Sequence, residues 1–390
     1  MKYDIVVIGA GIQGAGVAQA AAAAGYSVLV VEQTAPAAGT SSKSSKLIHG
    51  GLRYLESAQF GLVRESLRER ALLLRLAPEL VKLRPLHIPV YENSTRTALT
   101  IRTGLSLYAT LSGFDRNSLF RQLPHAEWDQ LTGLNQQGLK AVFRYNEAQT
   151  DDAALTRAVL QSAVLLGADL SMPARFVGAE RNGQCCKVDI ETDAGQQQSI
   201  SCRVLVNCAG PWATEVLSNI KPAVKHPPVE LVQGSHLLLP PLLSQYFYLE
   251  APSDQRAVFV LPWEGKLMVG TTEKPYQGRP DLAYCSEQEQ AYLLATLKHY
   301  FPALALDDTQ VETFAGLRVL PKSDKAAFGR SRDVIFSVDD EHHPRVLSVM
   351  GGKLTTYRAT AEAALARIMP SLPTKERRAD TRLVSLIPVH

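Results

Sequence analysis

The sequence predicts an α/β protein, because apolar strands run repeatedly into turns of small residues, the first and last of which open helices. The pattern occurs at residues 3–14, again at 204–212, and a third time at 345–353. Turns built from glycine and other small residues let the backbone approach a ligand closely. Their positions near the start, the middle and the end of the chain indicate one ligand-binding domain that a second domain interrupts twice.

The first of these units has the complete form of a dinucleotide-binding βαβ motif. It consists of an apolar strand at 3–8, the turn Gly9-x-Gly11-x-x-Gly14, a small-residue helix at 15–24, a strand at 27–31, and Glu32. Gly9 permits the tight turn, Gly11 lets a pyrophosphate approach the backbone, and Gly14 lets the helix pack close to the strand. Glu32 lies where an acidic residue accepts hydrogen bonds from ribose hydroxyls.

Length and composition fit a two-domain globular enzyme. The 390 residues can bury a sizeable core, and an apolar fraction of 46% is ordinary for such proteins. A formal net charge of +3 is too small to indicate nucleic-acid binding. The start of the chain lacks a signal-peptide pattern, and the five cysteines lack metal-ligand spacing. We therefore expect reduced thiols in a cytoplasmic protein without a metal site.

Changes of pattern along the chain divide the two domains. The ligand-binding domain is expected at residues 1–77, 150–220 and 327–390, and the substrate domain at 78–149 and 221–326. Helices are expected at 98–111, 153–166 and 355–368, and residues 221–326 are expected to be mostly strands. Asp151 and Asp152 place acidic groups at the positive end of the second of these helices.

A further set of motifs extends over essentially the whole chain. They are 40–56 (with His49-Gly50-Gly51-Leu52-Arg53-Tyr54-Leu55), 151–153, 206–212, Gln233-Gly234-Ser235-His236, 269–272, 316–318, 331–333, and Gly351-Gly352-Lys353-Leu354-Thr355-Thr356-Tyr357-Arg358. In this order they resemble the FAD-dependent glycerol-3-phosphate dehydrogenase family of the D-amino-acid-oxidase-like flavoproteins. The resemblance implies a Rossmann-like FAD-binding domain with an inserted, mainly antiparallel β-sheet substrate domain.

The chain departs from the family's pattern at three places. Leu317-Arg318-Val319-Leu320 stands where Val-Arg-Pro-Leu is usual, and Gln233 stands where a lysine is common. The chain stops at His390, near the point where family members begin an extra helical domain. We expect a folded two-domain enzyme with a more open substrate mouth and weaker discrimination between phosphorylated alcohols.

The resemblance implies that FAD is the cofactor and assigns the residues that hold it. In addition to Gly9, Gly11, Gly14 and Glu32, these residues are Ser41, Ser42, Ser45, Val177, Gly351, Gly352, Leu354 and Thr355. The serine hydroxyls are expected to donate to phosphate and ribityl oxygens, and the Val177 backbone to meet the adenine. The backbone amides of the turn at 351–355 are expected at the flavin's pyrimidine edge.

Oxidation of a secondary alcohol needs a base within hydrogen-bond reach of the hydroxyl group. Histidine suits this task, and both His49 and His236 lie in matched motifs, so the sequence leaves the choice open. A phosphorylated substrate also needs fixed cations. The cations in matched motifs are Arg53, Arg318, Arg332 and Lys353, and Tyr54 adds a hydroxyl group.

The resemblance implies oxidation of sn-glycerol 3-phosphate to dihydroxyacetone phosphate by hydride transfer to the flavin, with electrons passed on to a quinone or another acceptor. One alternative is an amine or 2-hydroxy-acid oxidase of the same superfamily, and another is a flavin-binding module without catalysis. Residues 99–111 either touch the inner face of a membrane peripherally or pack against the substrate domain, and a modest apolar face favours packing.

Overall fold

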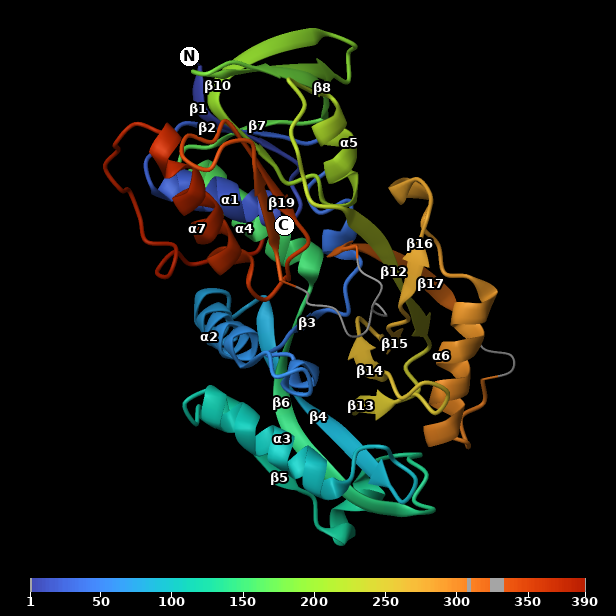
Figure 1. Ribbon diagram of the computed structural model, residues 1–390. Helices are drawn as coiled ribbons and strands as arrows, with labels where there is room; N and C mark the ends of the chain where they lie inside the picture. The colour runs from blue at the N-terminus through green and yellow to red at the C-terminus, as the bar shows by residue number, and fades with distance from the viewer. Residues whose placement is uncertain (1, 307–309, 323–332, 390) are drawn as a thin grey trace.

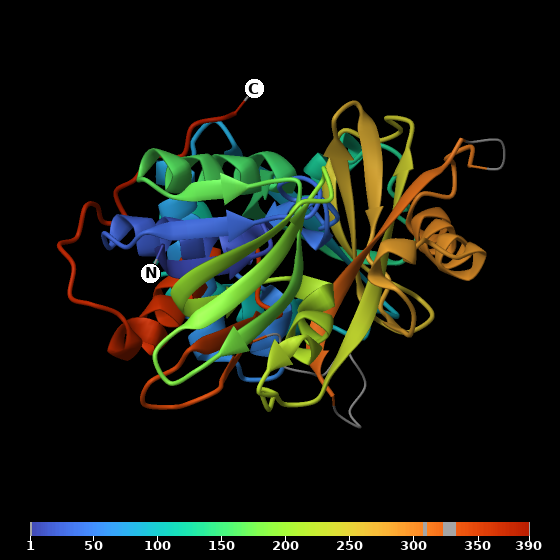
Figure 2. The same cartoon turned by 90° about the horizontal axis from the view of Figure 1, so that it is seen from above.

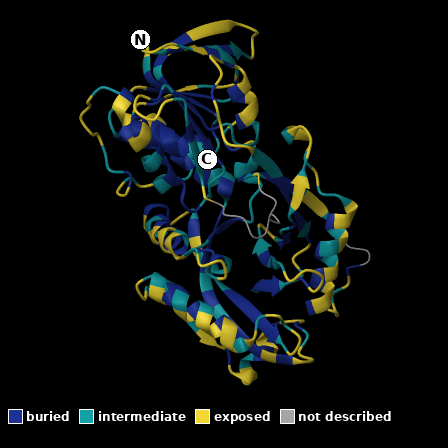
Figure 3. Ribbon diagram, viewed as in Figure 1, coloured by how far each residue is buried: buried dark blue, intermediate teal, exposed yellow. Residues whose placement is uncertain are grey.

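The chain folds around two β-sheets that lie beside each other (Figures 1 and 2). The computed structural model describes residues 2–306, 310–322 and 333–389. In this part of the chain one sheet has nine strands and the other has ten. The central strands of both sheets are largely buried, whereas the short strands at residues 120–122, 169–171 and 274–276 contain no buried residue (Figure 3).

The first sheet has a parallel centre. It consists of β1 (Tyr3–Ile8), β2 (Val28–Val31), β7 (Asp169–Ser171), β10 (Gln197–Asn207) and β19 (Val346–Met350). The strands β8 (Ala174–Arg181), β9 (Cys186–Thr192), β11 (Ile220–Lys221) and β18 (Ile335–Val338) extend it. The helices α1 (Ile12–Ala23), α4 (Asp152–Leu165) and α7 (Tyr357–Ile368) pack together in its main core. The short helix α5 (Ala213–Ser218) follows β10.

Helix α1 packs closely because its residues are small. A Cβ atom added at Gly14 would lie 1.9 Å from the carbonyl oxygen of Gly9, and one at Gly16 would lie 2.8 Å from the ring of Tyr357. Helix α4 begins at Asp152, and the Asp151 carboxylate caps it by accepting from two backbone amides at 2.9 and 3.0 Å. The cap that the acidic pair predicts is confirmed.

The second sheet runs in the order β16-β12-β15-β14-β13-β4-β6-β3, with β17 beside β12 and β5 beside β6. Its strands are β3 (Leu47–Ile48), β4 (Val81–Tyr91), β5 (Phe120–Gln122), β6 (Leu139–Thr150), β12 (Val229–Leu239), β13 (Tyr246–Glu250), β14 (Ala257–Trp263), β15 (Lys266–Gly270), β16 (Lys274–Tyr276) and β17 (Glu312–Pro321). The pairs in the described part are antiparallel, apart from β13 with β4. The predicted fold class, with a mixed α/β sheet and a mainly antiparallel one, is confirmed.

Two helices were not expected from the sequence. Helix α2 (Phe60–Leu76) follows the motif at residues 49–55, and α6 (Glu287–Tyr300) interrupts the region expected to be mostly strands. The start of α6 is a capping box, in which the Ser286 hydroxyl accepts from the Glu289 amide and the Glu289 carboxylate accepts from the Ser286 amide. Leu293 and Leu297 bury the inner face of α6 in the core of the second sheet.

The domain boundaries remain a prediction, and one strand of the first predicted segment belongs to the second sheet. Strand β3 lies within the first predicted segment, residues 1–77, yet it pairs with β6 of the second sheet at Leu47 and Gln149. The serine-rich loop that precedes β3 therefore connects the two sheets.

Helix α3 (Ala98–Leu111) has one buried face. Ile101, Leu105 and Tyr108 are buried against the second sheet and α2, whereas Leu99 is exposed. This is the packing arrangement that the sequence favoured for residues 99–111. None of the helices in the described ranges is long and apolar enough to cross a membrane.

Candidate functional site

A cavity of about 680 Å³ is lined by residues of both sheets. It brings together most of the residues that the sequence singled out: Gly9, Gly11, Glu32, Ser41, Ser45, His49, Arg53, Tyr54, Arg318, Gly351, Gly352, Lys353, Leu354 and Thr355. Four other predicted residues, Gly14, Ser42, Val177 and His236, lie outside its lining. Arg332 falls outside the described residues. The cavity lies within the size range of small-molecule and cofactor sites.

One end of the cavity is the glycine turn between β1 and α1. Gly9 has a φ of +100°, and a Cβ atom there would lie 2.7 Å from the carbonyl oxygen of Cys208, so only glycine fits. The Glu32 carboxylate accepts from the amides of Ala10 at 2.8 Å and Thr34 at 2.9 Å. Glu32 also accepts from the Thr34 hydroxyl at 3.2 Å, and since a carboxylate has lone pairs for about four hydrogen bonds, it keeps capacity for about one ribose hydroxyl.

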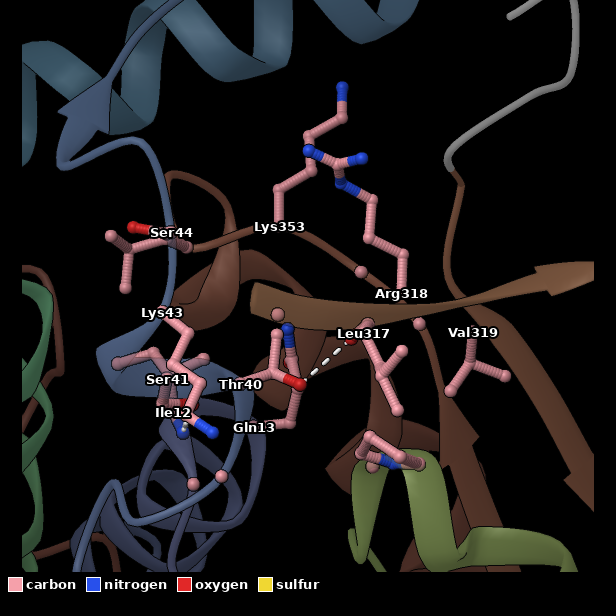
Figure 4. A pocket seen from close by; sticks show the side chains of 18 of the residues that line it. Ile12, Gln13, Thr40, Ser41, Lys43, Ser44, Leu317, Arg318, Val319 and Lys353 are labelled. Atoms are coloured by element: carbon pink, nitrogen blue, oxygen red, sulfur yellow. Dashed lines mark hydrogen bonds between the residues drawn. The ribbon is translucent and has the colours of Figure 1, made fainter. Parts of the chain in front are cut away.

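The serine-rich loop closes over this turn. The Ile12 amide donates to the Ser41 hydroxyl oxygen at 2.9 Å, which places Ser41 at the N-terminus of α1 (Figure 4). Thr40 donates to the carbonyl oxygen of Leu317 on β17 at 2.8 Å, the bond drawn in Figure 4. The loop thus joins the glycine turn to the second sheet, and Ser41 retains its own hydroxyl hydrogen for a ligand.

A buried ion pair fixes the far end of the same loop. Lys46 Nζ lies 2.6 Å from Asp152 Oδ1 and donates to the carbonyl oxygen of Ser42 at 2.7 Å. The other Asp152 oxygen accepts from the Ser44 amide at 2.9 Å. Ser42 also donates to the carbonyl oxygen of Gly39 at 3.1 Å, so it holds the loop in shape from outside the cavity.

The second glycine turn lies opposite, after β19. Gly351 and Gly352 have φ values of +77° and +87°, and a Cβ atom at Gly352 would lie 2.6 Å from the side-chain Nε2 of Gln13 at the start of α1. The Thr355 hydroxyl oxygen accepts from the His49 amide at 3.1 Å. Three chain segments that are far apart in the sequence therefore meet around the cavity.

Two cations extend from neighbouring segments of the wall. In Figure 4 the side chains of Arg318, on β17, and Lys353, after the second glycine turn, extend in the same direction. A Cβ atom at Gly234 would lie 3.0 Å from Arg318 Nη1, so glycine leaves room for the guanidinium. Lys353 Nζ lies 3.9 Å from the centroid of the Tyr54 ring, and Arg53 also lines the cavity.

The two candidate histidines have different surroundings. His49 is half-buried, lines the cavity, and lies beside Phe259 at 6.3 Å between ring centroids. His236 is only 1% exposed and stacks on Phe314 at 4.7 Å. Its Nε2 lies 2.8 Å from the Ser45 hydroxyl oxygen, and its Nδ1 has no hydrogen-bond partner among the described residues.

Burial makes His236 a neutral residue. Loss of solvent, followed by the charges of Arg318 and Lys46, lowers the pKa of His236 to about 3. A base with so low a pKa holds almost no proton near neutral pH. Among the described residues, His236 is linked to the cavity by its hydrogen bond with Ser45, which lines it.

A buried network behind the His49 turn escaped the sequence analysis. The Gly50 amide donates to the Tyr108 hydroxyl oxygen at 2.9 Å, and the Tyr108 hydroxyl donates to Glu147. Arg70 Nη1 lies 2.6 Å from the second oxygen of Glu147 and donates to Ser118 through Nη2, also at 2.6 Å. Burial raises the pKa of the Glu147 carboxyl, although Arg70 opposes the rise. The residues come from α2, α3 and β6, and no local motif marks them.

Gln233 and Val177, which the sequence singled out, do not line the cavity. Gln233 donates to the Glu289 carboxylate at 2.8 Å and to the carbonyl oxygen of Tyr284 at 2.9 Å, so it supports α6 rather than the cavity. Val177 lies where the pairing of β8 with β9 is irregular, between Phe176 and Gly178, and Phe176 is the residue that lines the cavity.

Comparisons with known proteins agree with this arrangement. The model of the FAD dependent oxidoreductase family matches residues 4–358. D-erythritol 1-phosphate dehydrogenase of Brucella abortus is 36% identical over 374 residues, covering 95% of this chain and 74% of its own length. Glycerol-3-phosphate dehydrogenase of Pseudomonas aeruginosa is 39% identical over 376 residues, with 94% and 72% covered. The structure of Bacillus halodurans glycerol-3-phosphate dehydrogenase complexed with FAD superposes with a TM-score of 0.76 at 27% identity, covering 99% of this chain and 68% of that one.

Proposed function

This chain belongs to the FAD-dependent oxidoreductase family, and we propose that it oxidises the secondary hydroxyl of a small phosphorylated polyol. The first substrate to test is sn-glycerol 3-phosphate, with dihydroxyacetone phosphate as its product. The relatives from P. aeruginosa and B. abortus are named for a three-carbon and a four-carbon polyol phosphate. Both names describe the same chemistry at different chain lengths.

FAD is the cofactor of this family, and it supplies the site with a two-electron oxidant. The residues present fit this group, since the glycine turn at Gly9 and the N-terminus of α1 suit a pyrophosphate. Glu32 would accept from the ribose, and Ser41 would donate to the phosphates or the ribityl chain. The backbone of Gly351 and Gly352 would face the ring system.

The observation that carries the substrate proposal is the direction of Arg318 and Lys353. Both side chains enter the same cavity beside the second glycine turn, and Arg53 lines it as well. Arginine binds phosphate through a planar fork and lysine as a point charge. A phosphate dianion requires more positive charge than the single carboxylate of an amino acid or a 2-hydroxy acid, so this group of cations favours a phosphorylated substrate.

His49 suits the role of base better than His236 does. The base must reach the substrate hydroxyl, and His49 lines the cavity beside the second glycine turn. His236 is buried behind Ser45. In this proposal His49 takes the hydroxyl proton while Arg318 or Lys353 stabilises the negative charge that develops on the oxygen. His236 orients Ser45 through the hydrogen bond at Nε2.

The decisive experiment is anaerobic reduction of the bound flavin by a panel of compounds. The panel contains sn-glycerol 3-phosphate, D-erythritol 1-phosphate, the unphosphorylated polyols, glycine and a 2-hydroxy acid. Reduction by the polyol phosphates alone supports the proposal. Reduction by glycine or the hydroxy acid would instead favour an oxidase of the same superfamily, and reduction by none would favour a binding module without catalysis.

The electron acceptor and the cellular location belong to the same proposal. We place the protein in the cytoplasm, with a quinone or another acceptor and peripheral contact with the inner face of the membrane. The apolar face of α3 packs against the second sheet, so of the segment that the family resemblance suggested for this contact, the exposed Leu99 at its start is the apolar residue available. Co-sedimentation with vesicles of mixed anionic and neutral lipids tests the contact, and lack of binding at low salt would contradict it.

A further inference from the structure

Arg256 and Glu273 form an ion pair in the cavity wall that the proposed reaction does not use. Arg256 Nη2 contacts the Glu273 carboxylate, and Nη1 donates to the backbone carbonyl oxygen of Glu273 at 3.1 Å. Both residues line the cavity. The Glu273 side chain is only 1% exposed, whereas that of Arg256 is 19% exposed, so Arg256 presents the accessible surface of the pair and Glu273 lies behind it.

We propose that this pair recognises the terminal hydroxyl group of the substrate, at the end opposite the phosphate. The inference rests on the proposed function, because it concerns the orientation in which a polyol phosphate binds in the site. It makes Arg256 and Glu273 specificity-determining residues for polyol phosphates.

The chemistry of the pair suits a hydroxyl group. An ionised carboxylate only accepts hydrogen bonds, a guanidinium only donates them, and a hydroxyl group can do both. The two charges of the pair cancel, so it offers no net attraction for a phosphate dianion, and Glu273 repels one at close range. Arg318 and Lys353 attract the phosphate in the same cavity. The substrate is therefore oriented with the phosphate at these cations and the hydroxyl end at the Arg256 guanidinium, whose charge Glu273 neutralises.

The positions of the two groups fit a short substrate. A Cβ atom at Gly234 would lie 2.6 Å from the Thr271 hydroxyl oxygen and 3.0 Å from Arg318 Nη1, so Thr271 and Arg318 are neighbours. Glu273 follows Thr271 by two residues, which span at most about 7 Å of chain. The backbone of Glu273 thus lies near the proposed phosphate site, and Arg256, which donates to its carbonyl oxygen, lines the same cavity.

The turn that carries Arg256 is held in place. The Ala251 amide donates to the Arg256 carbonyl oxygen at 2.8 Å, and Arg96 donates to the Gln255 carbonyl oxygen at 3.2 Å. Arg96 also forms ion pairs with Glu250, at 2.6 Å, and with Glu56, close to the motif of Arg53 and Tyr54. Such fixed groups discriminate well because they do not relax toward the wrong substrate.

The test compares two substrates that differ only in the terminal hydroxyl. sn-Glycerol 3-phosphate carries it, whereas 2-hydroxypropyl phosphate lacks it but keeps the secondary alcohol and the phosphate. A hydrogen bond to a charged group changes affinity by about 10- to 100-fold, so wild type should prefer glycerol 3-phosphate in kcat/KM by at least about tenfold. In Glu273→Gln, which cannot form the ion pair, the preference should fall to about threefold or less.

A matched control and a second variant make the result specific. Glu312→Gln removes the carboxylate of the exposed Lys266–Glu312 pair in the same sheet, 2.6 Å apart, and should keep the wild-type preference. Arg256→Lys keeps the charge but not the planar fork of the guanidinium, and it should also reduce the preference. It provides the test in the case that Glu273→Gln does not fold. Equal losses for both substrates in the two variants would make the pair purely structural and overturn the inference.

The same data separate this inference from the proposed function. Wild-type activity on glycerol 3-phosphate without a preference over 2-hydroxypropyl phosphate would overturn the inference alone. Absence of activity on both phosphates would overturn the proposed function and, with it, the inference.

Discussion

The Gly50 amide donates to the hydroxyl oxygen of Tyr108 at 2.9 Å, and this bond ties the turn after His49 to a helix that lies behind it. The Tyr108 hydroxyl in turn donates to Glu147, whose charge Arg70 balances. A Cβ atom at Gly50 would lie 2.4 Å from the same hydroxyl, so the turn and the tyrosine fit each other closely. The position of the proposed base thus depends on α3.

Tyr108→Phe removes this hydroxyl and leaves the ring in place. The Gly50 amide and Glu147 each lose a buried partner, and an unsatisfied buried group costs about 1–3 kcal/mol. We expect a lower urea midpoint together with a fall in kcat, because the His49 turn is no longer held. Tyr3→Phe, which loses an exposed hydrogen bond to Asp169 outside the cavity, is the control. Unchanged kcat in Tyr108→Phe would contradict the positioning role.

Asp152→Asn removes the buried charge that holds Lys46. Breaking a buried pair by removing one partner costs about 3–5 kcal/mol, because the other charge remains unpaired. We expect a large loss of stability and of FAD retention, since the serine-rich loop depends on Asp152. Urea denaturation and the flavin-to-protein absorbance ratio measure the two effects. Glu92→Gln, at an exposed ion pair with Lys140, should change stability by less than about 0.5 kcal/mol.

Arg318→Ala tests phosphate recognition. Loss of a buried charged contact costs about 2–5 kcal/mol, which corresponds to a fall of roughly 30-fold or more in kcat/KM for glycerol 3-phosphate. FAD content should remain near that of wild type. Arg121→Ala, at an exposed arginine that pairs with Glu127, serves as the control. A kcat/KM equal to that of wild type in Arg318→Ala would show that Arg318 does not bind the substrate.

Acid should destabilise the protein through His236. Its pKa is lowered to about 3 in the folded state, whereas an unfolded histidine titrates near 6.5. Between these values the unfolded state binds the proton and the folded state does not, so the contribution of His236 to stability is lost as the pH falls below about 6.5. From pH 7 to pH 5 the loss is about 2 kcal/mol.

The variant His236→Gln isolates this effect, because glutamine does not titrate. Its stability should depend less steeply on pH between 5 and 7 than that of wild type, whatever its absolute value. His226→Gln, at an exposed histidine, should keep the wild-type slope. Urea midpoints at pH 5, 6 and 7 measure the pH dependence of stability in the two variants and in wild type. Equal slopes of stability against pH in all three proteins would contradict the lowered pKa of His236.

The fold was predictable where local chemistry determines it. The glycines of the first turn, the acidic cap of α4 and the apolar strands each have a steric or electrostatic reason that a short window contains. Helix α6 was missed even though Ser286 and Glu289 form a capping box, because the strands around it dominated the interpretation. The signal was present in the sequence and could have been found.

The candidate site was predictable only in part. The motifs singled out Arg318, Lys353 and His49, which line one cavity, but they could not separate His49 from His236. That difference arises from burial, which depends on how Phe314 and the rest of the second sheet pack. The pair Arg256–Glu273 is formed between a hairpin turn and the segment after β15, so no local spacing in the sequence indicates it.

The order of the strands has a consequence for synthesis of the protein. The centre of the first sheet joins β1 to β10 through Ile5 and Val204, and β10 to β19 through Leu205 and Val346. A ribosome must therefore synthesise the chain past residue 352 before the last central strand and its glycine turn can take their places. Until then the nascent chain lacks one wall of its cavity, so FAD is expected to bind only after this segment has emerged and to complete folding as it does so.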